Sequence, residues 1–290
     1  MKLLISGANG QLGLALTRRL SGEHDVLALG RDEFDLADAN ACRETLKREQ
    51  PDVLLNCAAY TAVDRAESEP ELAHTINAEG PAHLAQACND HGIFLVHFST
   101  DYVFDGLATR PYVETDATAP MSVYGRSKLL GETRVAELSP EHLTLRLSWV
   151  YGNDGANFYK TMLRLAQDRS LLRVVADQRG VPNYTADLAD AVACALNRPL
   201  AELRQRSGLY HLSCQGVTSW RDFAHAIIEG AVLHHPVTVE PILTSEYPTA
   251  ATRPAYSALD ASRFAASFGW VAPDWQNGLR RCLADRSQAA

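Results

Sequence analysis

Short apolar runs alternate with helical patterns along the first half of the chain. The runs predict strands at residues 2–6, 26–29, 53–56, 94–99 and 143–147. The stretches between them carry apolar residues at the spacing of one helix face, which predicts helices at 11–20, 39–49, 71–91 and 123–137. Because the strands are mostly apolar and do not alternate with polar residues over their whole length, they are expected to be buried on both faces of a parallel sheet. The predicted fold class is therefore α/β, a Rossmann-type doubly wound parallel sheet.

This regular alternation loosens after Gly152. Residues 237–272 are rich in Pro, Ser and Thr and carry few periodic runs. We interpret this half as contributing a smaller α/β substrate-binding lobe whose parts are not contiguous in sequence. The elements predicted in this half of the chain are helices at 157–167, 186–197 and 219–229 and strands at 172–175 and 209–212. The expected division assigns 1–150 and 185–213 to a dinucleotide-binding Rossmann domain, and 151–184 and 214–290 to the lobe.

The composition narrows the range of partners. The 290-residue chain has 27 basic and 35 acidic residues, a net charge of −8, and no basic stripe that would neutralise the phosphates of a nucleic acid. Its 6 cysteines are scattered without a CxxC pair, so neither a zinc site nor a disulfide framework is expected. The first apolar run is too short for a signal peptide, and none approaches the roughly 20 residues of a membrane helix. We therefore expect a cytoplasmic protein that binds neither nucleic acid nor membrane.

A glycine-rich loop joins the first predicted strand to the first predicted helix. Gly7, Gly10 and Gly13 follow one another at intervals of three residues. The first glycine allows a tight turn, the second lets backbone approach a pyrophosphate, and the third lets helix and strand pack closely. The free N–H groups at the helix start would face the phosphates. The loop therefore predicts a dinucleotide site, with the GxxGxxG spacing of extended short-chain dehydrogenases.

The end of the second predicted strand bears on the choice of cofactor. NAD sites usually place an acidic residue there for the ribose 2′-hydroxyl, and NADP sites a cation for the 2′-phosphate. Here Gly30 stands at the acidic position and Arg31 follows, a side chain that can fork onto a phosphate. The neighbouring Asp32 and Glu33 could neutralise that arginine. NADPH is the expected cofactor, and NADH stays an alternative.

Tyr124 and Lys128 form a YxxxK motif at the start of a predicted helix. The i, i+4 spacing puts the phenol and the ammonium on one helix face. A free tyrosine has a pKa of about 10, and a cation one turn away is expected to lower it by favouring the phenolate. Thr100 stands at the carboxyl end of a predicted strand, where ligands meet an open α/β sheet. Its hydroxyl and that of Tyr124 are expected to stabilise the alkoxide formed when a nicotinamide reduces a carbonyl.

These motifs, taken with several others, resemble those of the dTDP-4-dehydrorhamnose reductase family of extended short-chain dehydrogenases along nearly the whole chain. The resemblance implies reduction of the C4 ketone of dTDP-4-dehydro-L-rhamnose, a dTDP-linked 4-keto-6-deoxyhexose, to dTDP-L-rhamnose, with Tyr124 as proton donor. This is the last step in the synthesis of that sugar donor. The residues that carry the resemblance are 7–13, 56–64 with Ala66 and Glu67, 99–106, 123–132, 148–152, Asn157 with Phe158, 177–182, and Arg253 with Pro254.

The resemblance also implies roles for individual residues, and a sugar nucleotide as the ligand of the lobe. Thr100, Tyr124 and Lys128 match the family's catalytic triad. The implied cofactor-binding residues are Gly7, Gly10, Gln11, Leu12, Gly13, Arg31, Asp35, Leu36, Ala58, Ala59, Tyr60, Thr61, Ser99, Tyr124 and Lys128. The implied substrate-binding residues are Thr100, Asp101, Tyr102, Trp149, Asn157 and Arg253.

The chain departs from the family's pattern at several positions. Gly30 stands where many members carry Asp, which again favours NADPH. Asn183 and Leu147 replace the usual threonines and are expected to reshape the substrate pocket. Some members form magnesium-bridged dimers through glutamates, but Ala15 and Ala186 stand at two of those positions. No metal site is therefore predicted, and a homodimer through other surfaces stays open.

Three other functions compete with a reductase. A 4,6-dehydratase needs an acid and a base after the triad threonine, but here Tyr102 follows Asp101, so the base is missing. A reductase or an epimerase acting on a related dTDP-4-keto-deoxysugar would keep all the residues named above. A non-catalytic NADP-binding regulatory subunit could keep the glycine loop, although nothing would then hold the triad in place. These last two stay open as alternatives.

Overall fold

A six-stranded sheet forms the centre of the computed structural model, which describes residues 1–289, with side chains to Arg286. All neighbouring strands of this sheet run parallel, so the predicted doubly wound α/β fold is confirmed. The order β10-β5-β4-β3-β1-β2 reverses its direction at β1, between β3 and β2. Such a reversal is where open α/β sheets bind ligands. The strands are β1 (Lys2–Ser6), β2 (Asp25–Leu29), β3 (Val53–Asn56), β4 (Phe94–Thr100), β5 (His142–Leu147) and β10 (Gly208–His211).

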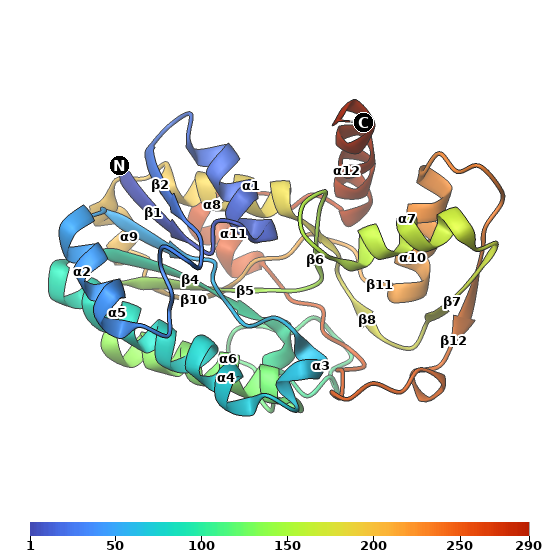
Figure 1. Ribbon diagram of the computed structural model, residues 1–290, viewed down its shortest axis with the longest axis horizontal. Helices are drawn as coiled ribbons and strands as arrows, with labels where there is room; N and C mark the ends of the chain where they lie inside the picture. Colours follow the sequence, from blue (N-terminus) through green and yellow to red (C-terminus); the bar gives the residue numbers. More distant parts are fainter. Residues whose placement is uncertain (290) are drawn as a thin grey trace.

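Helices cover both faces of this sheet (Figure 1). Side chains alternate along each strand, so Leu3 and Ile5 of β1 pack in one core with residues of α1 and α8. Leu4, between them, packs in the opposite core with residues of α2 and α5. This two-sided burial explains why most residues of the strands are apolar. The helices are α1 (Gln11–Leu20), α8 (Thr185–Leu196), α2 (Ala39–Glu49), α5 (Gly80–His91) and, on the same face as α5, α6 (Val123–Leu138).

The helix predicted at 71–91 is interrupted by a wider turn. It consists of α4 (Pro70–His74), a π-helical turn η1 (Thr75–Glu79) and α5. The π turn packs against α6 so closely that a side chain at Gly131 would overlap the carbonyl of Asn77. Turns of this kind often mark functional sites.

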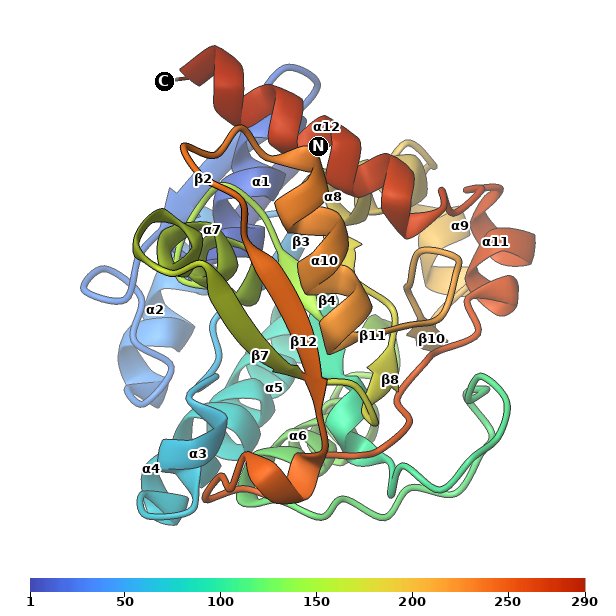
Figure 2. The same ribbon diagram turned by 90° about the vertical axis from the view of Figure 1, so that its right-hand side faces the viewer.

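A smaller lobe lies beside the carboxyl edge of the sheet (Figure 1). Its two parallel strands are flanked by helices in the view of Figure 2. Its core is separate from those of the sheet and includes Tyr159, Phe223 and Trp275. The main lobe elements are β7 (Leu171–Val175), β12 (Thr238–Ile242), α7 (Phe158–Asp168), α10 (Trp220–Gly230) and α12 (Trp275–Ala289). Short pairs join β6 (Val150–Tyr151) to β9 (Asn183–Tyr184), and β8 (Arg179–Gly180) to β11 (Thr218–Ser219).

The segment 237–272 holds more regular structure than its composition indicated. It contains β12, a 3₁₀ turn (Thr244–Glu246) and α11 (Ser262–Phe268). Assigning α11 to the lobe was wrong, because Phe264 and Phe268 pack in the core of the sheet, edge-on to Tyr210 of β10. The other predicted boundaries between the Rossmann domain and the lobe remain predictions. The remaining elements are α3 (Val63–Ala66), the 3₁₀ turn η2 (Asp101–Val103) and α9 (Leu200–Gln205). Among the described residues, no helix has the length and apolar character needed to span a bilayer.

Candidate active site

A cavity of about 450 Å³ opens where β1, β3, β4 and β5 end and the lobe begins. It brings together the three residues of the predicted triad and much of the predicted cofactor and substrate sites. The predicted residues that line it are Gly10, Gln11, Leu12, Ala59, Thr61, Ser99, Thr100, Asp101, Tyr102, Tyr124, Lys128, Trp149 and Asn157. The predicted residues outside its lining are Gly7, Gly13, Arg31, Asp35, Leu36, Ala58, Tyr60 and Arg253.

The glycine loop forms a tight turn at one end of this cavity. Gly7 has φ +64°, and a Cβ on it would lie 2.6 Å from the backbone nitrogen of Ala58, so no other residue fits. Gly13 packs against the carbonyl of Gly7 with equally little room for a side chain. Gly10 is the N-cap of α1 and supplies no side chain to cap it. The first turn of α1 therefore presents its N–H groups to an anion.

Arg31 lies beyond the cavity, at the end of β2. Its side chain is largely exposed, and its Nε lies 3.9 Å from a carboxylate oxygen of Asp35. Glu33 accepts a hydrogen bond from the Gly30 N–H at 3.0 Å. A Cβ on Gly30 would lie 2.5 Å from the side-chain nitrogen of Asn9. A larger residue at position 30 would therefore clash with the Asn9 side chain. Arg31 is the cation available to a phosphate at this edge.

The first turn of α6, which carries Tyr124, is fixed from two sides. Ser122 is its N-cap and accepts a hydrogen bond from the Gly125 N–H at 3.1 Å. Glu67 accepts a second from the Val123 N–H at 2.8 Å, and its negative charge is favourable at a helix N-terminus. The position of the phenol is therefore set by the helix start rather than by a loop.

Asn77, in the π turn, is a site residue that the sequence analysis missed. Its side-chain oxygen accepts the Tyr60 N–H at 2.8 Å, and its amide donates to the Tyr60 carbonyl and to Ser127 Oγ, both at 3.0 Å. Ser127 donates in turn to the carbonyl of Tyr124 at 2.9 Å. Asn77 thus joins the predicted cofactor loop to the catalytic helix. The only indication in the sequence was a polar residue on the buried face of a predicted helix.

The pKa of Tyr124 is not lowered by Lys128 as the spacing of the two residues predicted. Lys128 is 2% exposed, and its Nζ donates to the Phe98 carbonyl at 2.7 Å. Burial lowers the pKa of Lys128 to about 8. Burial raises the pKa of Tyr124 to about 12, and a hydrogen bond with Thr100 lowers it only in part. The predicted lowering of this pKa was wrong for the protein without bound ligand, because desolvation outweighs the charge one turn away.

Thr100 and the two residues after it form a compact hydrogen-bonded corner at the end of β4. Thr100 Oγ1 accepts the Tyr102 N–H at 3.2 Å and donates to Asp101 Oδ1 at 3.1 Å. The ring of Tyr102 meets that of Tyr124 edge-on, with 5.6 Å between their centroids. Thr100 and Asp101 are both buried. The hydroxyl, carboxyl and two phenol groups therefore lie together on one wall of the cavity.

Trp149 forms the opposite wall of the cavity in a strained conformation. Its φ is +41°, in the left-handed region that a bulky residue rarely adopts. Its indole stacks on that of Trp220 at 3.5 Å between centroids and leaves no room for a side chain at Gly180. Strain of this kind persists where surrounding contacts impose it, and it concentrates at ligand sites. Trp220 and Phe158, neither of which was predicted as a site residue, complete this aromatic wall.

Asn183 does not line the cavity, but its hydrogen bonds fix the backbone on either side of the cavity residue Trp149. Its amide donates to the Ser148 carbonyl at 2.7 Å and to the Val181 carbonyl at 2.9 Å, while its oxygen accepts the Cys214 N–H at 2.6 Å. The Asn183 N–H donates to the Trp149 carbonyl at 3.1 Å. Its effect on the pocket is therefore indirect, whereas Leu147 lines the cavity directly.

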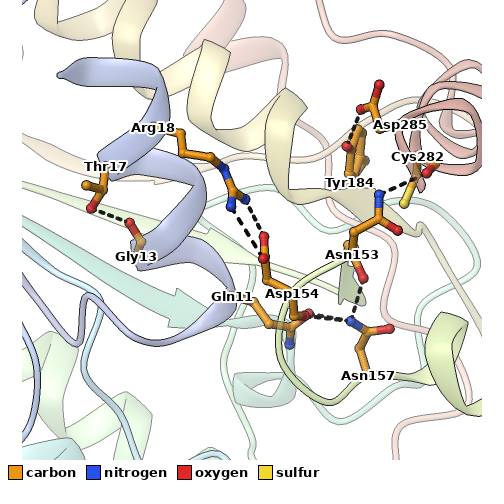
Figure 3. Close-up of polar contacts among 11 residues, drawn as sticks. Gln11, Gly13, Thr17, Arg18, Asn153, Asp154, Asn157, Tyr184, Cys282 and Asp285 are labelled. Carbon is orange, nitrogen blue, oxygen red and sulfur yellow. Dashed lines mark hydrogen bonds and ion pairs between the residues drawn. The ribbon is translucent and has the colours of Figure 1, made fainter. Parts of the chain in front are cut away.

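Asn157 and Gln11 join the lobe to the start of α1 (Figure 3). The Asn157 amide donates to Gln11 Oε1 at 2.8 Å and to the Gly152 carbonyl at 2.9 Å, and its oxygen caps α7. Arg18 of α1 forms an ion pair with Asp154 in the same loop. Asn157 lies at the cavity, but its polar atoms are already engaged, so it positions the loop rather than offering free groups to a substrate.

Arg253 lines a second cavity, of about 390 Å³, on the lobe side of the aromatic wall. It donates two hydrogen bonds to the carboxylate of Asp64, at 3.0 and 2.7 Å, which fixes its guanidinium. Arg169 and Arg173, the latter paired with Glu246 at 2.7 Å, line the same cavity, whereas the lining residues of the first cavity include one cation, Lys128. The second cavity therefore offers a cationic site to an anionic part of a ligand.

Fold and site together define an oxidoreductase of the extended short-chain dehydrogenase type. The model of the family described as "RmlD substrate binding domain" matches residues 1–288. The dTDP-4-dehydrorhamnose reductase of Burkholderia thailandensis is 44% identical over 294 residues, covering 98% of this chain and 99% of that protein. The chain belongs to the dTDP-4-dehydrorhamnose reductase family.

Solved structures of this family superpose on nearly the whole chain. The Clostridium acetobutylicum dTDP-4-dehydrorhamnose reductase has a TM-score of 0.93 at 39% identity, covering 99% of this chain and 100% of that one. The Bacillus anthracis enzyme, solved in complex with NADP, has a TM-score of 0.92 at 38% identity, covering 98% and 99%.

Proposed function

We propose that this protein reduces the C4 ketone of dTDP-4-dehydro-L-rhamnose to dTDP-L-rhamnose with NADPH. The observation that carries the proposal is the cavity in which Thr100, Tyr124 and Lys128 meet beneath the glycine loop and opposite the wall of Trp149. A fixed acid, a second hydroxyl and a buried cation around one ketone are what carbonyl reduction requires.

The residues around the glycine loop fit a dinucleotide. A Cβ at Gly7 or Gly13 would clash with neighbouring backbone, so the tight turn needs glycine at both positions. The start of α1, which no side chain caps, suits a pyrophosphate. Lys128 would reach the ribose of the nicotinamide half, and Arg31 the 2′-phosphate of the adenosine half. The bound cofactor supplies the hydride that reduces the ketone.

Tyr124 is suited to give a proton rather than to take one. Because burial raises its pKa to about 12, the phenol is protonated at neutral pH. As negative charge develops on the C4 oxygen, Tyr124 donates its proton, and the charge of Lys128 stabilises the resulting phenolate. Because Lys128 is buried, its charge acts through a medium of low dielectric, which strengthens this interaction.

The sugar nucleotide would extend from the first cavity into the second. The apolar face of a hexose suits the indole of Trp149. The diphosphate carries negative charge, so it suits the second cavity, where Asp64 holds Arg253 in place. The sugar and the nucleotide would thus lie on opposite sides of Phe158 and Trp220, which line both cavities.

The decisive experiment supplies purified protein with enzymatically made dTDP-4-dehydro-L-rhamnose and either NADPH or NADH. We expect the reduced cofactor to be oxidised, which its absorbance reports. We also expect dTDP-L-rhamnose to form, which NMR identifies. A regulatory subunit would bind cofactor without turnover. An epimerase would convert the sugar without consuming reduced cofactor, and a related reductase would yield the other C4 epimer.

Replacing Arg31 by alanine is expected to weaken NADPH binding about 10- to 100-fold, because a hydrogen bond to a charged group contributes about 1.5–3 kcal/mol and every 1.4 kcal/mol is about tenfold. NADH binding should change little, since it lacks the 2′-phosphate. Fluorescence titration with each cofactor measures both constants. Arg134→Ala, on the exposed side of α6, is the matched control. Equal losses for the two cofactors would refute the phosphate role.

A further inference from the structure

The Thr100 hydroxyl has no proton free for a substrate in the arrangement described above. Its oxygen accepts the Tyr102 N–H, its single hydrogen is donated to Asp101 Oδ1, and the Tyr124 hydroxyl also lies in hydrogen-bond contact with it. A ketone held beside Tyr124 needs donors, not acceptors. Thr100 can therefore assist the reduction only if Asp101 stops accepting its hydrogen.

Asp101 is placed to make that change. It is 2% exposed and lines the cavity, and its Oδ2 has no hydrogen-bond partner among the described residues. Its other contacts are the hydroxyl groups of Thr100 and Ser257 and the backbone N–H groups of Asp101 and Tyr102. No cation among the described residues neutralises the carboxylate, and a buried carboxylate without a cation is costly.

The charged and titratable groups facing Asp101 favour its neutral form. Tyr102 and Tyr124 pack beside it, and its charge would raise the pKa of both. Arg253 faces Tyr102 and is already paired with Asp64. Desolvation raises the pKa of Asp101 to about 7, which is consistent with this geometry.

We propose that Asp101 serves the reaction in its protonated form, as the residue that turns the Thr100 hydroxyl toward the substrate. A protonated carboxyl donates to Thr100 Oγ1 in place of accepting from it, and the Thr100 hydrogen then points to the C4 oxygen beside that of Tyr124. The second carboxyl oxygen, which has no protein partner, accepts from a sugar hydroxyl. No proton leaves Asp101, since the one transferred comes from Tyr124. The inference rests on the proposed function and adds a positioning residue to it.

The test compares Asp101→Asn with Asp101→Ala in pH profiles of kcat/KM for the sugar nucleotide. We expect the wild-type value to fall as the pH rises through about 7, because the ionised carboxylate recaptures the Thr100 hydrogen. Asn cannot ionise, so its profile should stay flat until Lys128 loses its charge near pH 8. Asn should keep kcat within about tenfold of wild type. Ala should lose about 100-fold, the lower range for the loss of one oriented hydrogen-bond donor, because nothing then directs the Thr100 hydroxyl to the C4 oxygen.

Asp105→Asn is the matched control, since this carboxylate lies in the same segment outside the cavity and accepts from Tyr112 at 2.8 Å. It should keep the wild-type profile. NADPH titration checks that each variant still binds cofactor. The inference is overturned if Asp101→Asn keeps the wild-type fall near pH 7 or loses as much kcat as the alanine variant. Failure of the proposed function would differ, because the wild-type protein itself would then show no turnover.

Discussion

Replacing Tyr124 by phenylalanine is expected to lower kcat about 10²- to 10⁴-fold, the contribution of a positioned acid to proton transfer. The phenyl ring keeps the edge-on contact with Tyr102 and occupies the same volume in the cavity, so only the hydroxyl is lost. Because the cofactor would be held mainly by the glycine loop and Lys128, its dissociation constant should change less than threefold. Steady-state kinetics and NADPH titration of the same preparation measure the two effects.

Tyr210→Phe is the control for that substitution. Its hydroxyl donates to the Arg206 carbonyl at 2.9 Å, on the edge strand β10 and outside both cavities. The same chemical change there should leave kcat near the wild-type value. A Tyr124 variant that kept more than about a tenth of the wild-type kcat would remove this residue as the acid.

Replacing Glu132 by alanine is expected to cost about 3–5 kcal/mol of unfolding free energy, the usual result of removing one partner of a buried ion pair. Glu132 of α6 and Arg146 of β5 form two hydrogen bonds, at 2.9 and 2.7 Å, with side chains 8% and 3% exposed. Without the carboxylate, the guanidinium would remain buried beside His211, whose pKa is lowered to about 3 by burial and by that same charge. A neutral histidine cannot replace the lost carboxylate.

Urea unfolding followed by circular dichroism measures this loss. Glu137→Ala, which removes an exposed partner of Arg134 at 3.5 Å, should change stability by at most about 1 kcal/mol. The double variant Glu132→Leu with Arg146→Met should recover a large part of the loss, because it leaves no buried charge without a partner. A double variant no more stable than Glu132→Ala would show that packing, not charge, explains the cost.

The sequence was most informative where one local rule decides the structure. Largely apolar runs identified the parallel strands, because a strand buried on both faces has no solvent-facing polar side. The same reasoning placed Thr100 at the ligand-binding edge, since the carboxyl ends of parallel strands share one edge. The tight turn predicted at Gly7 is present, and its φ of +64° and its contact with Ala58 leave no alternative residue.

Contacts between distant segments were beyond such rules. The pairs Trp149–Trp220 and Asp64–Arg253 join residues that no local pattern relates. The π turn at Asn77 leaves a helical pattern nearly unchanged, so it was read as a plain helix. The direction of the Tyr124 pKa shift was also missed, because spacing shows a neighbouring charge but not the depth of burial that outweighs it.

The distribution of the cores along the chain implies an order of assembly during synthesis. The core between the sheet and α2 and α5 uses buried residues from Leu4 to Val135 only. The opposite core also needs α8 and α11, through Phe268, and the lobe core needs Trp275, Leu279 and Cys282 of α12. A growing chain can therefore complete its first core at mid-length. The lobe, which carries the Trp220 side of the aromatic wall, stays unfinished until α12 has left the ribosome.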